Sequence, residues 1–424
     1  MNNYKVIIAH PGRQHSFRLA SALKKHGHLY KYISTVYNKE SSLLMKIGKI
    51  VLNNDNLRRL RNRKNNDLLD KEVVQFNELY GLFLLLILRL DSKKYLFNSL
   101  NNHLSKLFGK KVANYAIKNN VDAVICYDGS FCALTCFTIL KEKAPNIIRI
   151  IDHAHPPRNF LHDVYKNLES SSKEFTLTYE SCEYLTSESR LKKDAAEIDS
   201  AQKHIVASNF SIKALYYNNV CSGDICKVPY GVNHDVFHHI NLKLDINKKI
   251  NILFIGEINQ RKGIKQILEA AKILSDQNFQ FNLIGLGMSN HSELYKPYKN
   301  YVNFLGLVSF ETLLGQLKSS DVFIFPSLGE GFGLVLLEAL SSGLPVISSR
   351  NCAGPDLIED GKNGFLIDAG DTSALVDKIL WFQSNRDKLL EMSQYARQSS
   401  LKYTWETYEK KVVSGIEMFL NDTD

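Results

Sequence analysis

Two glutamates flank a glycine-rich turn that leads into a helix-favouring segment. Glu330 lies in the turn, Glu338 lies eight residues further on, and Gly331 and Gly333 stand between them. The free amides and positive dipole of a helix start attract an anion, and glycine lets the anion approach closely. At about 1.5 Å rise per residue, the two carboxylates are roughly 12 Å apart or less. A nucleotide-sugar fits this pattern, because its diphosphate lies between two hydroxyl-bearing ends.

The elements around this turn follow the order strand, turn, helix, break and strand. The aromatic and β-branched run Val322–Phe325 stops at Pro326, and the helix-favouring segment Leu334–Leu340 precedes a Gly343-Leu-Pro345 break. This order is typical of a strand-to-helix unit in a doubly wound sheet. A plain alternative is an ordinary helix of such a sheet, whose first turn carries Glu330 for the dipole.

A second turn in this half of the chain carries adjacent cations. Ile250–Ile255 and Gly256 form a strand and its end, and Arg261 and Lys262 then precede a predicted helix over residues 264–274. Cations in a strand-to-helix turn can neutralise a diphosphate leaving group.

The N-terminal half also has polar residues after predicted strands. The strand run Lys5–Ala9 leads into a loop without the G-x-G-x-x-G pattern, which argues against dinucleotide binding. A second strand, Ile147–Asp152, is followed by His153 and His155, with no further ligand motif that would complete a metal site. We therefore predict no metal site and no cofactor.

The size and composition indicate a soluble, two-domain protein. The chain has 424 residues, 44% hydrophobic and 23% charged, with a net charge of +9. This charge is compatible with anionic nucleotides or an anionic bilayer and does not indicate nucleic acid. Seven cysteines without a C-x-x-C pair indicate free thiols and a cytoplasmic location. The longest apolar run, Leu82–Leu88, is too short to span a bilayer.

The chain departs from simple strand and helix alternation from about Ser41 to Lys111. Within this range, lysines and arginines interrupt the apolar sequence of residues 43–64. With the apolar run Leu82–Leu88, they could form basic amphipathic helices that rest on the cytoplasmic face of the inner membrane. The other interpretation is helices that pack on the sheet with a solvated basic face, the more common outcome for a charge run. The sequence leaves both open.

The stretch from Glu330 to Glu338, with G-F-G after the first glutamate, F-P-S before it and A-L-S-S-G-L-P-V-I after it, resembles a known signature. It is similar to the donor site of retaining glycosyltransferases of the GT-B fold, family 4. The resemblance implies an α/β fold with two Rossmann-like doubly wound domains facing a cleft. It implies an acceptor-binding domain over residues 1–240, a nucleotide-sugar domain over 250–400 and a helix over 401–424 that crosses back.

The resemblance also implies roles for individual residues. The implied catalytic residues are Glu330, Arg261, Lys262 and one of His155 and His153. The implied donor-binding residues are Glu338, Gly331, Phe332, Gly333, Leu334, Val335, Gly256 and Val308. The implied acceptor side of the cleft has Gly12, Arg13, His15 and Ser16. One departure is Glu257, which stands directly after the glycine where common relatives carry an arginine.

The activity implied by the resemblance is metal-independent transfer from a UDP- or GDP-sugar to a glycan or lipid-linked acceptor, with retention of configuration. The abundance of Asn, Lys and Ile suggests an AT-rich microbial genome, which favours a role in bacterial surface polysaccharide biosynthesis. Two other functions fit the same residues. One is a nucleotide-sugar epimerase, which needs no acceptor, and the other is a non-catalytic protein that binds a sugar nucleotide.

Overall fold

The computed structural model describes most of the chain. The described residues are 3–12, 16–39, 42, 62–90, 95–129, 132–168, 174–175, 178, 187–237, 248–287 and 292–421. Arg13, His15 and residues 43–61 of the basic segment lie outside this set, as do residues 238–247 around the expected linker.

The first sheet has seven parallel strands in the order β3-β2-β1-β4-β5-β6-β7. They are β1 (Val6–Ala9), β2 (Leu29–Ser34), β3 (Val73–Gln75), β4 (Ala123–Tyr127), β5 (Ile148–Asp152), β6 (Lys203–Val206) and β7 (Ile225–Lys227). β1, β4 and β5 are buried along their whole length, as expected for a parallel sheet covered on both faces. The strand order reverses between β1 and β4, where ligands bind in such sheets.

The second sheet has six parallel strands in the order β10-β9-β8-β11-β12-β13. They are β8 (Ile250–Ile255), β9 (Phe279–Ile284), β10 (Val302–Gly306), β11 (Val322–Phe325), β12 (Val346–Ser349) and β13 (Gly364–Ile367). Its order reverses between β8 and β11. The turns that follow these two strands carry the cationic pair and Glu330, so the topology brings both turns to one edge.

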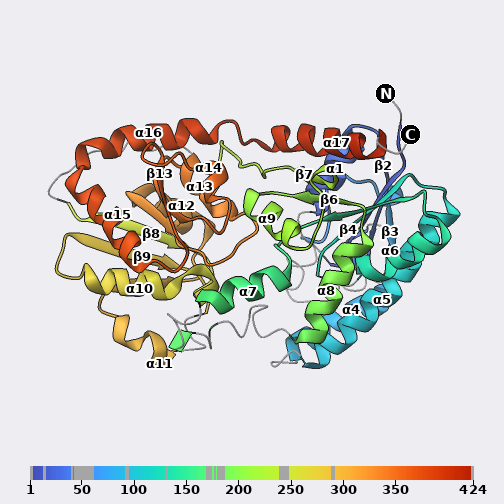
Figure 1. Ribbon diagram of the computed structural model, residues 1–424, viewed down its shortest axis with the longest axis horizontal. Coiled ribbons are helices and arrows are strands. Elements are labelled where there is room, and N and C mark those ends of the chain that lie inside the picture. The colour runs from blue at the N-terminus through green and yellow to red at the C-terminus, as the bar shows by residue number, and fades with distance from the viewer. Residues whose placement is uncertain are drawn as a thin grey trace.

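Helices flank both sheets (Figure 1). Those of the first sheet are α1 (Ser16–Lys25), α4 (Glu78–Leu90), α5 (Tyr95–Lys118), α6 (Cys132–Lys143), α7 (Arg158–Leu168), α8 (Glu188–Ser200) and α9 (Asn209–Tyr217). Those after β8 are α10 (Ile264–Ile273), α11 (Ser292–Tyr295), α12 (Phe310–Ser319), α13 (Leu334–Ser341), α14 (Gly354–Leu357), α15 (Thr372–Ser384), α16 (Leu389–Ser400) and α17 (Trp405–Asn421). The predicted fold class, α/β with two doubly wound sheets, is confirmed.

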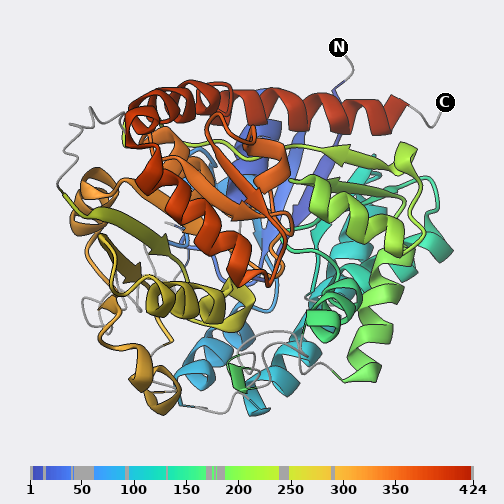
Figure 2. The same cartoon turned by 60° about the vertical axis from the view of Figure 1, so that its left-hand side comes forward.

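The last helix, α17, runs along the first sheet rather than the second (Figures 1 and 2). It packs against α1, and the segment just before it pairs with the chain that follows β7, through a bridge between Val232 and Thr404. The two segments approach so closely that a Cβ on Gly231 would lie 2.4 Å from the carbonyl carbon of Thr404. Only glycine fits at that position.

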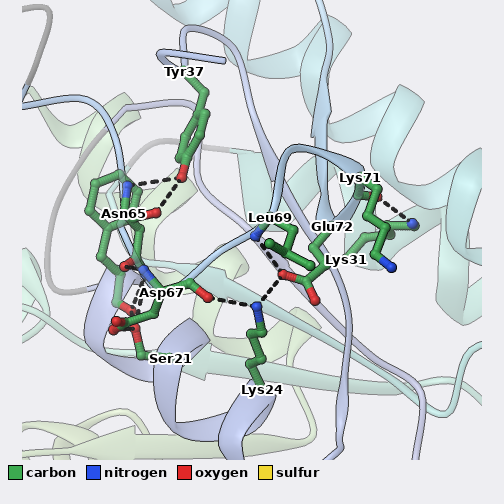
Figure 3. A network of polar contacts seen from close by, with 10 residues as sticks. Ser21, Lys24, Lys31, Tyr37, Asn65, Asp67, Leu69, Lys71 and Glu72 are labelled. Carbon is green, nitrogen blue, oxygen red and sulfur yellow. Dashed lines mark hydrogen bonds and ion pairs between the residues drawn. The ribbon is translucent and has the colours of Figure 1, made fainter. Parts of the chain in front are cut away.

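A polar network holds the chain between residue 62 and β3 against α1 (Figure 3). Asn65 accepts a hydrogen bond from the Tyr37 hydroxyl at 3.0 Å and donates from its side chain to Ser21 at 2.9 Å. Lys24 contacts the Glu72 carboxylate at 2.7 Å. These contacts fix the entry into β3, the edge strand next to which α4 begins.

No helix in the described ranges combines the length and the apolar character that crossing a membrane requires. The apolar run Leu82–Leu88 lies inside α4, which has 13 residues.

Candidate active site

Glu330 is paired with both cations of the neighbouring turn. Nη1 of Arg261 lies 2.6 Å from Oε2 of Glu330, and Nζ of Lys262 donates to the same oxygen. The cations belong to a short 3₁₀ turn after β8 (Gln260–Lys262), whereas Glu330 follows β11. Only 11% of the side chain is exposed in Glu330 and in Lys262. The three residues therefore form a nearly buried charge cluster.

The two turns are held together by backbone contacts that require glycine. Gly263 has a φ of 73°, and a Cβ there would lie 2.1 Å from the carbonyl oxygen of Pro326. The Arg261 carbonyl accepts hydrogen bonds from the Ser327 hydroxyl at 3.0 Å and from the Leu328 amide at 2.8 Å. The position of the cations thus follows from the pairing of β8 with β11.

The charges of the cluster shift the pKa values of its members. Burial alone would raise the pKa of Glu330, but Lys262 and Arg261 outweigh it and hold that pKa well below its ordinary value. Burial lowers the pKa of Lys262, an effect that Glu330 opposes and Arg261 reinforces. A second carboxylate, the exposed Glu257, lies 3.6 Å from Nη2 of Arg261. The nearly buried trio itself contains two cations and one carboxylate, a composition that favours an anionic ligand.

The two oxygens of Glu330 differ. Both cations contact Oε2, and within the described residues Oε1 accepts no hydrogen bond. One oxygen can therefore order the cations while the other binds a ligand hydroxyl.

The start of α13 presents backbone donors next to this cluster. Gly333 caps the helix with a φ of 86°, a left-handed conformation that favours glycine. In the described part of the chain, the amides of Leu334 and Val335 donate no hydrogen bond, as is normal for a first helical turn. Phe332 is buried, with its ring 5.2 Å from that of Tyr230. It therefore serves packing between the two sheets.

Glu338 is half-buried on α13, and burial raises its pKa. Among the residues that the structure describes, no group donates a hydrogen bond or an ion pair to its carboxylate. A carboxylate in this situation loses hydration without compensation, which makes it a good acceptor for ligand hydroxyls.

The structure separates the two histidines that follow β5. His155 is exposed, and its positive influence lowers the pKa of Glu330, so it lies at the edge of the charge cluster. His153 is buried, with Nε2 3.0 Å from Nδ1 of His204, and burial lowers the pKa of both imidazoles. Of the two candidates, only His155 is open to a ligand.

The loop that carries His155 touches the glycine turn of the second sheet. A Cβ on Gly331 would lie 2.7 Å from the carbonyl oxygen of Ala154. The Gly331 carbonyl in turn accepts hydrogen bonds from the hydroxyls of Ser208 and Ser211, which begin α9. The carboxyl ends of both sheets therefore meet at this turn.

Sequence reasoning missed the residues that hold the His155 loop. Oδ1 of Asp128, after β4, accepts a hydrogen bond from the Ala154 amide at 3.1 Å. Glu197 on α8 is buried and accepts from the Gly129 amide at 2.9 Å, and burial raises its pKa to about 7. Glu197 resembles any exposed helical glutamate in the sequence, so no local signal could have identified it.

The remaining predicted residues follow strands of both sheets. Gly256 and Val308 follow β8 and β10 and are both half-buried. The Gly12 amide donates to Nδ1 of His10 at 2.8 Å. Ser16 is fully buried with its hydroxyl 3.0 Å from that of Tyr32, so its side chain packs in the core. In the described ranges, no group of three or more His, Cys, Asp or Glu could hold a metal ion.

Comparison with known proteins identifies the second half of the chain. Residues 239–399 match the family described as glycosyl transferases group 1. An amylovoran biosynthesis glycosyltransferase from Erwinia amylovora is 32% identical over 155 residues, 33% of this chain and 38% of the relative. A phosphatidyl-myo-inositol mannosyltransferase from Mycobacterium leprae is 28% identical over 197 residues, 45% of this chain and 52% of the relative. The chain thus spans about half or less of both curated relatives.

The fold extends over the whole chain. A solved glycosyltransferase from Rickettsia africae superimposes with a TM-score of 0.61 over 99% of each chain, at 19% sequence identity. At this identity the likeness shows the architecture alone, which is the two-sheet GT-B fold. The chain therefore carries a domain of the group 1 glycosyl transferases at residues 239–399, within the GT-B architecture.

Proposed function

We propose that this protein is a retaining, metal-independent glycosyltransferase that moves a sugar from a UDP- or GDP-sugar to a glycan or lipid-linked acceptor. The observation that carries the proposal is the cluster of Glu330, Arg261 and Lys262. It combines two cations with a carboxylate oxygen, Oε1, that neither cation contacts, beside the open amides of α13. This combination suits a diphosphate joined to a sugar.

The donor would lie across the edge where the turns after β8 and β11 meet. Arg261, Lys262 and the amides at the start of α13 would bind the diphosphate, because all of them are donors or cations. Glu338 would accept from the ribose hydroxyls, since its carboxylate has no partner among the described residues. Oε1 of Glu330 would accept from a sugar hydroxyl while Oε2 keeps the cations ordered.

Catalysis would rest on stabilising the charge that develops when the bond between the anomeric carbon and the phosphate oxygen breaks. The electron pair leaves with the diphosphate, where the cations and amides stabilise it. The acceptor hydroxyl then attacks from the side of the leaving group and gives its proton to the departing phosphate, so the configuration is retained. His155, at the exposed edge of the cluster, would contact the donor sugar.

The names of the relatives support the choice of acceptor and setting. One relative is named for amylovoran biosynthesis, and another is named a phosphatidyl-myo-inositol mannosyltransferase. These names support a glycan or lipid-linked acceptor and a role in bacterial surface polysaccharide biosynthesis, performed on the cytoplasmic side of the membrane.

The test is donor turnover by Lys262→Ala, with Lys272→Ala on the exposed part of α10 as the matched control. A thermal-shift screen of UDP-, GDP- and ADP-sugars first selects the donor, because a ligand at about 100 times its dissociation constant stabilises by roughly 2.7 kcal/mol. We expect Lys262→Ala to lose at least about a hundredfold in turnover while it melts as a folded protein. Nuclear magnetic resonance of the product's anomeric proton then reports retention.

Transfer at the parent rate by Lys262→Ala would count against the proposal. Incubation with donor alone tests the epimerase alternative, since an epimer would form without acceptor. A protein that binds sugar nucleotides and turns none over with any acceptor would be a non-catalytic binder.

A further inference from the structure

Helix α4 carries a continuous apolar stripe that faces solvent. Leu79, Phe83, Leu86 and Leu90 are 69%, 48%, 52% and 75% exposed. They follow one another at intervals of four, three and four residues, which places all four on one side of an α-helix.

Helix α5, which packs beside α4, also carries exposed leucines. Leu96 and Leu107 are 53% and 37% exposed and lie eleven residues apart, so they share one side of α5. The Tyr80 hydroxyl on α4 donates to the Leu100 carbonyl of α5 at 3.0 Å, so the two helices lie against each other. We call the six exposed residues the α4–α5 face: Leu79, Phe83, Leu86, Leu90, Leu96 and Leu107.

The α4–α5 face is not needed for the packing of the hairpin. The opposite sides of the helices carry buried residues, Leu84 on α4 and Leu104 and Phe108 on α5, and α5 packs on α6. The face supplies six of the eighteen large apolar side chains that are exposed among the described residues, and Leu88 of α4, which lies outside the face, is a seventh on these two helices. Soluble proteins normally scatter such side chains singly, so this concentration marks an interaction surface.

The charge beside the face identifies the kind of partner. Helix α5 contains Lys106, Lys110, Lys111 and Lys118, all exposed, and no acidic residue, and the only acid of α4 is Glu78 in its first turn. Lys110 lies one turn beyond Leu107, at the border of the face. A second copy of the chain would bring its own lysines against these, which like-charge repulsion disfavours. An anionic bilayer complements both the exposed apolar side chains and the lysines, because its apolar layer lies below anionic head groups.

The position of the two helices and the length of α4 also suit contact with a flat membrane surface. The two helices lie on the side of the molecule opposite to α17 in both views (Figures 1 and 2). With 13 residues, α4 is about 20 Å long, which suits a helix lying in the plane of a bilayer interface.

We propose that the α4–α5 face docks this protein on an anionic lipid bilayer. The leucines and the phenylalanine enter the boundary between head groups and acyl chains, and the lysines of α5 bind the anionic head groups. This proposal is independent of the glycosyl transfer proposed above.

The test is flotation of the purified full-length protein with vesicles of phosphatidylcholine, with and without phosphatidylglycerol. We expect binding to the vesicles that contain phosphatidylglycerol and its loss in high salt. The double variant Phe83→Ser/Leu86→Ser should bind at least about tenfold more weakly, because two inserted side chains are removed. The variant Lys106→Gln/Lys110→Gln should weaken binding to the anionic vesicles by a similar factor.

The matched control is Ile273→Ser/Leu401→Ser, which removes side chains that are 60% and 48% exposed on other surfaces. It should bind vesicles like the parent protein. Thermal melting and donor binding should be unchanged in all of these variants, because every altered side chain is exposed and none belongs to the charge cluster. Parent-like flotation by Phe83→Ser/Leu86→Ser would overturn the proposal. So would light scattering that shows a dimer in the parent and a monomer in that variant, since a second copy would then cover the face.

Discussion

Nη1 of Arg261 lies 2.6 Å from Oε2 of Glu330, although 69 positions separate the two residues in the chain. The contact exists because β8 and β11 are adjacent and parallel, so the turns after them meet at one edge of the second sheet. The carboxylate contacts both cations, which hold its pKa well below the ordinary value.

Glu330→Gln should disable this cluster. Without the carboxylate, Arg261 and Lys262 face each other as like charges, so we expect turnover to fall at least about a hundredfold and the unfolding free energy to fall by about 2 kcal/mol. Steady-state kinetics and denaturant unfolding measure the two effects. Glu257→Gln is the control, because Glu257 is exposed and lies 3.6 Å from Arg261. Equal losses in both variants would contradict the role of the buried pair.

Glu338→Gln should weaken donor binding without weakening the fold. Its carboxylate has no partner among the described residues, so the substitution removes no protein contact. We expect the dissociation constant of the donor to rise by about tenfold, because one or two hydrogen bonds to a charged acceptor are lost. Titration calorimetry measures it, with Glu311→Gln on the exposed part of α12 as control. An unchanged donor affinity would contradict the proposal that Glu338 binds the ribose hydroxyls.

His155→Ala should affect turnover, whereas His153→Ala should affect stability. His155 is exposed beside the cluster, so its loss should lower turnover by about a hundredfold and leave the melting temperature unchanged. His153 is buried 3.0 Å from His204, so its loss should cost about 1–3 kcal/mol of unfolding free energy. Comparing kinetics and melting for both variants separates the two roles. A turnover loss confined to His153→Ala would reverse the assignment.

Gly331→Ala should push the two sheets apart at the active site. The added methyl would lie 2.7 Å from the Ala154 carbonyl oxygen, which is too close for either backbone to stay in place. We expect kcat/KM to fall at least about tenfold, because the His155 loop moves away from the donor. Gly315→Ala is the control, since no atom lies within 4 Å of a Cβ added there. A parent-like Gly331→Ala would show that the contact has no role in catalysis.

Asp152→Asn should change how stability depends on pH. Asp152 ends β5 and is buried, and burial raises its pKa from an ordinary 3.8 to about 7. The native state therefore keeps this proton between about pH 4 and 7 while the unfolded chain releases it. The contribution to stability is fully present below pH 4 and is lost as pH rises through 7, by up to about 1.4 kcal/mol per pH unit. Asp152→Asn should make this slope shallower, while Glu197, whose pKa burial also raises to about 7, keeps its own contribution.

Urea unfolding in one-unit steps from about pH 4 to pH 8 measures the slope. Asp276→Asn, an exposed control, should keep it. If the Asp152→Asn protein kept the parent slope, groups other than Asp152 would be responsible for it.

Local sequence predicted much of the second sheet. The strands Ile250–Ile255 and Val322–Phe325 were predicted with their observed bounds, because apolar runs that end at Gly256 and Pro326 leave little choice of conformation. The apolar run in α4 was harder to interpret. Leu82–Leu88 is apolar on all sides, so its period carries no information on which side packs inward, and only contacts with α5 decide that.

The sequence by itself determined the chemistry available where the turns after β8 and β11 meet, because the types of Glu330, Glu338, Arg261 and Lys262 and the glycines near them are local facts. Only the tertiary structure decided that Glu330 contacts both cations, that His155 and not His153 is exposed, and that Glu197 binds the amide of Gly129, next to Asp128. Those facts depend on which strands become neighbours and on how each loop leaves its strand. Contacts between residues far apart in the chain arise when the sheets assemble, and no short stretch of sequence encodes them.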